Sequence, residues 1–321
     1  MATKMLSIPS YGFESECREI HNSWERLSQL GLVLATRTRQ ERQQIRETYK
    51  AIYGEDLVNR LQEPKIANNN NKSEISPKLC TILSLWMLDL PERDAILARQ
   101  ALQQDHDINY KVLVEIFIGR KSSHILLMKQ AYHARFKRQF DQDIVNIEPP
   151  NPYQKILVAL IASHKAHHVD VSQHIAKCDA RRLFQTGEGN LGAIEEAVVL
   201  EILSKRSIPQ LKLTFYCYKH IYGHDYTKSL KREKSGEFEG ALKMVVKCIC
   251  NPPNYYAKVL HGSIKGNIEG VMVSRAESSD FDEIQRCYKN KYGIELREAI
   301  SETIPSGDYR DFLLALLART K

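Results

Sequence analysis

Apolar residues recur along the whole chain at the spacing of amphipathic helices, and no useful length of sequence alternates with the period of two that a strand shows. The clearest sign is an aromatic pair four residues apart, which occurs four times: Tyr49–Tyr53, Tyr132–Phe136, Tyr218–Tyr222 and Tyr288–Tyr292. Residues four apart lie on one face of a helix. Each pair is followed by a second apolar helical run, such as LCTILSLWML (79–88) or YRDFLLALLA (309–318). The pattern predicts an all-α protein.

The aromatic pairs belong to a longer internal repeat. Each of four aligned segments carries an arginine 12 or 13 residues before the first tyrosine of its pair: Arg37, Arg120, Arg206 and Arg275. The matching tyrosines are 83, 86 and 70 residues apart. Such a period is typical of arrays of similar structural units. We expect an N-terminal tail at 1–12 and four helical repeats at 13–86, 87–166, 167–252 and 253–321.

Composition indicates where such a protein works. The 321 residues carry a formal net charge of +7, which favours anionic partners such as lipid headgroups or nucleic acid. Seven cysteines without a CxxC pair indicate free thiols in a reducing compartment. The N-terminal segment lacks the apolar stretch of a signal peptide, and the longest apolar runs are too short to cross a bilayer. We therefore expect a cytoplasmic protein whose association with membranes is peripheral.

Several segments of the chain resemble the annexins, most closely those of plants. The segments are PERDA (91–95), AYHARFKR (131–138), LSKRS (203–207), VVKCICNPP (245–253) and SGDYRDFLLALL (306–317). The resemblance covers nearly the whole chain and recurs in all four units at a common register. It implies four annexin repeats of about five helices each, which form a slightly curved disc. It also implies calcium sites on the convex face that bridge the protein to an anionic phospholipid membrane surface.

In that family a calcium site combines a G-x-G-T turn with a distant carboxylate. Calcium takes roughly six to eight oxygen ligands, so the main-chain carbonyls of a glycine turn can bind it and the carboxylate completes the shell. In repeat 3 the turn is GEGNLGAIEE (187–196), where Ala193 and Ile194 replace the threonine and aspartate of the family. We expect a weak calcium site there. The ligands that the resemblance implies are Glu188, Asn190, Gly192 and Glu233.

The other three loops depart further from the family pattern. Repeat 4 keeps Gly262 before a serine, and Glu302 stands 40 residues later, so a partial site is expected. In repeat 1 the turn is replaced by NSWE (22–25), and the carboxylate position falls on Pro64. In repeat 2 the loop DHDI (105–108) lacks a glycine. We expect most calcium sites to be lost and the calcium dependence of membrane binding to be much reduced.

Other chemistries find less support. Gly187, Gly189 and Gly192 fit the G-x-G-x-x-G of a dinucleotide-binding turn, but that turn follows a strand, whereas HIAKCDARRLF (174–184) is helical in pattern. A histidine cluster could bind a metal or form a solvated linker; its members are His164, His167, His168 and His174. No nucleophile, base and carboxylate can be grouped from the sequence, so we do not expect an enzyme.

Trp24, in the former repeat 1 loop, is a candidate membrane contact, because an exposed indole can anchor in the lipid interface. Packing against the N-terminal tail is the alternative. Basic segments at 137–139, 228–234 and 289–291 offer a calcium-independent route to anionic lipid. Nucleic acid is not expected as a partner, because no aromatic platform is interleaved with the basic residues. The alternative function is a helical scaffold that keeps the annexin fold and acts through protein partners.

Overall fold

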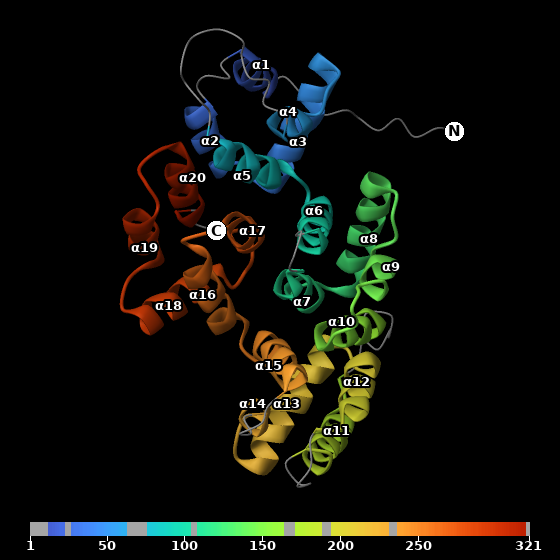
Figure 1. Cartoon of the computed structure of the whole chain (residues 1–321). Helices are drawn as coiled ribbons and strands as arrows, with labels where there is room; N and C mark the ends of the chain where they lie inside the picture. Colours follow the sequence, from blue (N-terminus) through green and yellow to red (C-terminus); the bar gives the residue numbers. More distant parts are fainter. Residues whose placement is uncertain are drawn as a thin grey trace, which may run out of the picture. The chain divides into compact units, whose positions relative to one another are not determined.

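The computed structural model describes residues 12–22, 27–62, 76–103, 108–163, 171–187, 194–230 and 236–318. Within these ranges the chain forms twenty helices and no strand, which confirms the all-α prediction (Figure 1). Five helices fall in each predicted repeat. The repeat boundaries themselves remain a prediction.

The first two repeats supply ten helices. Repeat 1 contains α1 (Glu14–Asn22), α2 (Leu27–Thr36), α3 (Arg39–Tyr53), α4 (Leu57–Gln62) and α5 (Pro77–Met87). Repeat 2 contains α6 (Leu90–Leu102), α7 (Tyr110–Gly119), α8 (Ser122–Phe136), α9 (Phe140–Val145) and α10 (Pro152–Ser163).

The last two repeats follow the same order. Repeat 3 contains α11 (Gln173–Gln185), α12 (Glu196–Lys205), α13 (Ile208–Tyr222), α14 (Tyr226–Ser229) and α15 (Glu237–Cys250). Repeat 4 contains α16 (Pro252–Ser263), α17 (Glu269–Arg275), α18 (Phe281–Tyr292), α19 (Leu296–Thr303) and α20 (Asp308–Leu317).

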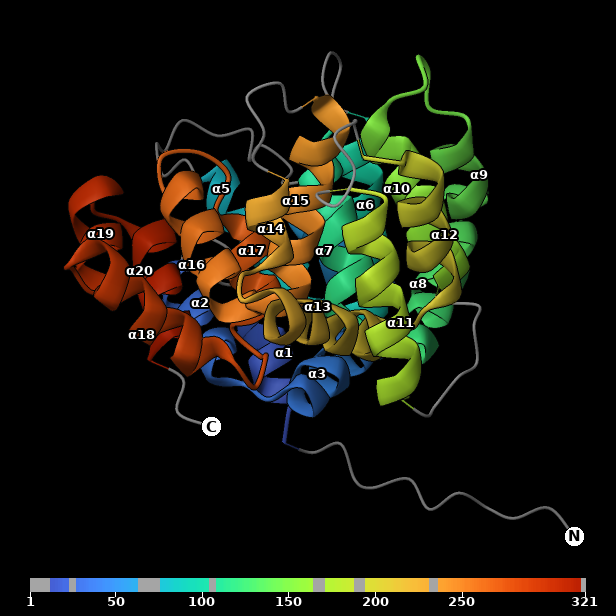
Figure 2. The ribbon, with the colours of Figure 1, turned by 90° about the horizontal axis from the view of Figure 1, so that it is seen from below.

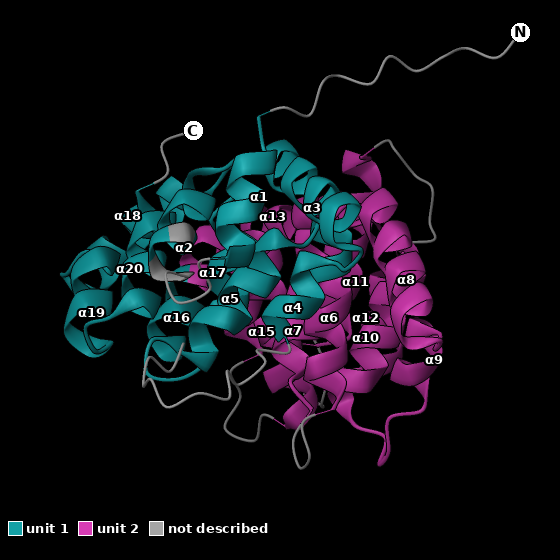
Figure 3. Ribbon diagram, turned by 90° about the horizontal axis from the view of Figure 1, so that it is seen from above, with its two compact units in different colours: residues 1–93, 257–321 teal, residues 94–256 magenta. Residues whose placement is uncertain are grey.

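The chain divides into two compact units, coloured separately in Figure 3. Unit 1 comprises residues 1–93 and 257–321, and unit 2 comprises residues 94–256. Unit 1 joins the first and the last repeat: α2 packs along α20, and α5 packs against α17. Unit 2 joins the two middle repeats, because α10 packs along α12 and against α15. Within repeat 3, α13 packs along α11 (Figure 2).

The recurring arginine pairs with the first helix of its own repeat in three of the four repeats. Arg120 Nε lies 2.6 Å from Asp94 Oδ2, and Arg206 Nε lies 2.7 Å from Asp179 Oδ2. Arg37 Nη2 makes the same kind of pair with Glu16 at 2.8 Å. In repeat 4 the segment PNYYA stands where repeat 2 has PERDA, so a tyrosine replaces the carboxylate. In repeats 1, 2 and 3 the ion pair fixes the first helix against the start of the third.

The recurring tyrosine is a core residue in every repeat. Its side chain is at most 1% exposed, and its ring packs against the aromatic ring four residues later, at centroid distances of 4.7 to 5.0 Å. The hydroxyl groups reach different partners. These are His21 for Tyr49, Asp143 for Tyr132, Ser229 for Tyr218 and His261 for Tyr288. The aromatic spacing seen in the sequence thus marks the hydrophobic side of the third helix.

Left-handed residues end the third helices. Gly54, Gly223 and Gly293 have φ angles of 73°, 76° and 74°, where only glycine avoids a steric cost. Repeat 2 places Lys137 there, at φ 56°. Each of these four residues donates its backbone N–H to the carbonyl four residues earlier and so closes the last turn.

Two arginines are buried in the core of unit 1. Arg93 donates to the carbonyls of Leu85, Trp86 and Leu88 at the end of α5, and to that of Val273 in α17. The last carbonyls of a helix have no intrahelical donor and carry partial negative charge, so a guanidinium satisfies them. Arg93 therefore fastens the ends of α5 and α17 to one another.

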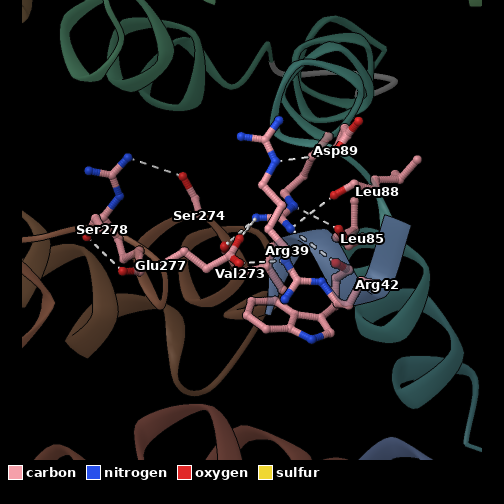
Figure 4. Close-up of polar contacts among 12 residues, drawn as sticks. Arg39, Arg42, Leu85, Leu88, Asp89, Val273, Ser274, Glu277 and Ser278 are labelled. Carbon is pink, nitrogen blue, oxygen red and sulfur yellow. Dashed lines mark hydrogen bonds and ion pairs between the residues drawn. The ribbon is translucent and has the colours of Figure 1, made fainter. Parts of the chain in front are cut away.

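Glu277 supplies the carboxylate of this cluster. It lies 2.5 Å from Arg42 Nη2 and 3.3 Å from Arg93 Nη1, and Figure 4 shows it with Arg42 and the carbonyl-bearing residues around it. The Arg42 guanidinium also lies over the ring of Trp86, at 3.9 Å from the centroid. We call Arg42, Trp86, Arg93 and Glu277 the unit 1 clamp.

Candidate functional site

The loops between the first and second helix of each repeat are where the sequence predicts calcium sites. They span 23–26, 103–109, 186–195 and 264–268. Most predicted site residues lie outside the residues that the structure describes: Trp24, Glu188, Asn190, Gly192 and Glu233. Gly262 and Glu302 of repeat 4 are described. The structure therefore describes the two ends of the repeat 3 loop and the residues on both sides of the repeat 4 loop.

The two ends of the repeat 3 loop are joined. The backbone N–H of Glu195, which precedes α12, donates to the carbonyl of Thr186, which caps α11, at 3.0 Å. At Gly187 a Cβ atom would lie 3.0 Å from the carbonyl oxygen of Leu183, so any side chain would crowd the last turn of α11. The first glycine of GEGNLG thus permits a sharp exit from the helix, and the loop closes at its base.

Repeat 4 has a different geometry at the predicted turn. Gly262 and Ser263 are the last two residues of α16, and Ile264 still donates to the carbonyl of Leu260 at 3.0 Å. The non-helical connection comes only afterwards, at 264–268. Glu302 is exposed near the end of α19. Gly262 therefore sits in helical backbone here, not in an open glycine turn.

In repeat 2, aromatic and amide side chains pack together where the second helix, α7, and the fifth helix, α10, begin. Tyr110, the first residue of α7, stacks on Tyr153, the second residue of α10, with centroids 5.0 Å apart. Asn151 donates to the hydroxyl of Tyr110 and accepts the N–H of Gln154. At the loop itself, the N–H of Asn109 donates to the carbonyl of Ala101 at 2.9 Å. This cluster ties the second helix to the fifth.

Repeat 4 has a glutamate and a tyrosine at the same two helix positions. Tyr309, the second residue of α20, donates to Glu269, the first residue of α17, at 2.8 Å, and both side chains are buried. Burial and this carboxylate raise the pKa of Tyr309. Sequence reasoning missed both clusters. The signal available was a polar or aromatic residue at equivalent helix starts in repeats 2 and 4.

Comparison with known proteins decides the family. Human annexin A13 is 32% identical over 292 residues, which cover 89% of this chain and 87% of that protein. The annexin-like protein RJ4 of Fragaria ananassa is 31% identical over 293 residues, with 89% and 88% covered. The solved structure of annexin III superposes with a TM-score of 0.80 at 30% identity, covering 100% of this chain and 97% of the other. The chain belongs to the annexin family.

The family model, described as annexin, matches residues 28–64 and 178–245. The second of these segments contains the whole repeat 3 loop together with Glu233. Calcium-dependent binding to phospholipid is characteristic of annexins, and this agrees with the partner class that the net charge indicates.

Across the described ranges, no group of three or more His, Cys, Asp or Glu side chains is placed to hold a metal ion. None of the described helices is long and apolar enough to cross a bilayer.

Proposed function

We propose that this annexin binds anionic phospholipid surfaces peripherally, from the cytoplasm, and with much reduced calcium dependence. Repeat 3 is the calcium site in this proposal: Glu188, Asn190 and Gly192 offer main-chain carbonyls, and Glu233 offers the carboxylate. Bound calcium would supply open coordination positions for a lipid phosphoryl oxygen. The observation that carries the proposal is the repeat 3 loop, whose ends are hydrogen-bonded to each other at Thr186 and Glu195.

Repeat 4 is the secondary site of the proposal. Its residues are Gly262 and Glu302, and the helical backbone at Gly262 gives fewer outward-facing carbonyls than a glycine turn. Repeat 2 has the Tyr110–Tyr153 cluster where a ligand set would be needed, and we propose that it binds no calcium. Trp24 is proposed as an apolar contact with the lipid interface. Binding, not catalysis, is the activity proposed.

Co-sedimentation with phosphatidylserine vesicles tests this function. We expect calcium to increase the fraction of protein that pellets, and Glu233→Gln to remove most of that increase. Glu302→Gln should have a smaller effect. The matched control is Glu237→Gln, because Glu237 is an exposed carboxylate at the start of α15, four residues beyond Glu233.

Two outcomes would contradict the calcium mechanism. Pelleting that ignores calcium but is reversed by salt would assign binding to the basic segments, since screening weakens interactions between exposed charges. No pelleting under any condition would leave the scaffold function, in which the annexin fold serves protein partners alone.

A further inference from the structure

The third helix of every repeat has the same orientation of buried and exposed positions. The buried tyrosine fixes the alignment, and the residue two places before it is exposed in all four repeats. In repeat 3 that residue is Tyr216, which is 67% exposed. The equivalent residues in the other repeats are Glu47, Gln130 and Arg286. Only repeat 3 therefore presents an aromatic ring at this position.

The neighbours of Tyr216 on the same face are basic. Lys212, Lys219 and His220 are all exposed and lie at helical spacings of four, three and four residues from Tyr216. At the position of Lys212 the other repeats carry Gln43, Leu126 and Asp282. We call Lys212, Tyr216, Lys219 and His220 the α13 stripe.

One lysine of the α13 stripe forms an ion pair with an aspartate. Lys219 Nζ lies 3.1 Å from Asp225 Oδ1, and both side chains are more than half exposed. An exposed pair of this kind contributes little free energy, so a phosphate can compete for the lysine. Lys212 adds positive charge on the other side of Tyr216.

The two rings of the stripe are nearly parallel. The centroids of Tyr216 and His220 lie 6.5 Å apart, with an angle of 8° between the planes. A planar base that stacks at about 3.4 Å from each of two rings needs about 7 Å between them. The gap between the two ring planes is at most the centroid distance of 6.5 Å, so the rings as placed do not hold a base between them, and the exposed ring of Tyr216 is the stacking surface.

We propose that the α13 stripe binds single-stranded nucleic acid, with one base stacked on Tyr216 and the adjoining phosphates at Lys212 and Lys219. Stacking on exposed aromatic side chains beside a basic groove is how proteins bind single strands without sequence preference. The sequence alone gave no such platform, because the exposure of Tyr216 and its alignment with His220 come from the packing of α13 along α11. The site is independent of calcium and of the phospholipid function proposed above.

Fluorescence anisotropy with an end-labelled oligouridine tests the proposal, on the full chain at low salt with a calcium chelator. Loss of stacking on one base corresponds to about 1 kcal/mol or more, so Tyr216→Ala should weaken binding by about 5-fold or more. Tyr216→Phe should retain binding, because the phenyl ring still stacks. Replacing Lys212 and Lys219 together by Gln should flatten the slope of log affinity against log salt by about 1.4. Since these side chains are exposed, the variants should keep the wild-type circular dichroism spectrum.

The matched control is Arg286→Ala, because Arg286 is the exposed residue of α18 at the position of Tyr216. We expect it to bind oligouridine as the wild type does. Equal weakening by Arg286→Ala and Tyr216→Ala would overturn the proposal in favour of binding by net charge, and so would wild-type affinity of Tyr216→Ala.

Two further measurements distinguish a single strand from a free mononucleotide and from a lipid headgroup, because all three carry phosphate. If uridine monophosphate displaces the oligonucleotide at an equal concentration of nucleotide, the stripe is a mononucleotide site and the single-strand assignment is wrong. If Tyr216→Ala lowers pelleting with phosphatidylserine vesicles but not oligonucleotide binding, the stripe faces lipid, and the proposal is again overturned. Loss of calcium-dependent pelleting in Glu233→Gln would leave this proposal unaffected.

Discussion

The most deeply buried charged groups of the two units carry opposite charges. In the described part of unit 1 they are guanidiniums: Arg93 and Arg42 are 0% and 1% exposed, whereas their carboxylate partner Glu277 is 20% exposed. In unit 2 the buried groups are carboxylates. Asp94 and Asp179 are 1% and 2% exposed, and their partners Arg120 and Arg206 are 10% and 26% exposed.

The difference shows two ways to stabilise a buried charge. Arg93 is satisfied mainly by main-chain carbonyls at helix ends, so its stabilisation does not depend on the protonation of one group. Asp94 is satisfied by side chains, Arg120 and His124. We therefore expect the stability of unit 1 to depend on the hydrogen-bonding geometry of a guanidinium. The stability of unit 2 should depend on carboxylates that acid can protonate.

The largest expected effect comes from Arg93→Met. The variant leaves the carbonyls at the ends of α5 and α17 without a donor and removes one of the two arginines that pair with Glu277. Breaking a buried charged network of this kind costs about 3 to 5 kcal/mol. Urea unfolding followed by tryptophan fluorescence measures it, because Trp86 lies beside Arg93 and can be made the sole tryptophan by Trp24→Phe.

Arg39→Met is the control for Arg93→Met. Arg39 belongs to the same region (Figure 4), but it is 54% exposed and pairs with Asp89 at 3.3 Å. An exposed pair contributes at most about 1 kcal/mol, so the midpoint should move little. Similar losses in the two variants would show that the carbonyl contacts of Arg93 contribute no special stability.

Asp94→Asn has the next largest expected effect. Burial alone would raise the pKa of Asp94, but hydrogen bonds and charges from His124 and Arg120 lower it from 3.8 to about 2. A shift of this size corresponds to about 2 kcal/mol of stability, which is present above pH 3.8 and is lost as the pH falls towards 2. Hydrogen exchange of unit 2 amides should therefore accelerate in Asp94→Asn at neutral pH.

The pH dependence separates Asp94 from a structural defect of the variant. The difference between wild type and Asp94→Asn should shrink as the pH falls below 3.8, because the wild-type carboxylate is then protonated as well. Asp141→Asn is the control, since Asp141 is 35% exposed and pairs with Lys129 in the same unit. A difference that stays constant down to acid pH would refute the role assigned to the charge.

Much of the fold could be predicted because its determinants are local. The aromatic pair four residues apart fixes one face of a helix, and its fourfold recurrence with a preceding arginine predicted the array of helices. The unit 1 clamp could not be predicted in this way. Its partners Arg42 and Glu277 are 235 residues apart, and no local pattern links them.

The candidate site also has features that the local sequence predicts and features that it does not. The glycines of the repeat 3 loop and Glu233 were assigned through the resemblance to the annexin calcium turn, whose parts lie within one repeat, and they remain a prediction. The helical backbone at Gly262 was not foreseen, because the residues that follow it decide where α16 ends. Exposure is equally invisible: Tyr216 and Tyr218 are two residues apart, yet the first is 67% and the second 0% exposed.

The smallest expected effect concerns a pair of equivalent histidines in unit 1. His21 Nδ1 lies 2.9 Å from the hydroxyl of Tyr49, and its ring stacks on Tyr53 at 3.8 Å. His261 repeats this arrangement with Tyr288 at 3.0 Å and a stacking distance of 3.8 Å. The difference is Arg60, whose Nη1 lies 3.2 Å from His21 Nδ1 and has no counterpart beside His261 among the described residues.

His21 gives unit 1 an acid sensitivity of its own, in a different pH window from that of Asp94. Burial, and then the charge of Arg60, lower the pKa of His21 below 6.5, against the opposing effect of Glu55. A lowered histidine pKa means that stability is complete above pH 6.5 and declines as the pH falls through the folded-state pKa. NMR titration should show His21 protonating below pH 6.5, and Arg60→Gln should move its titration upward. If Arg60→Gln does not move the His21 titration, the arginine is no part of the cause, and burial alone lowers the pKa of His21.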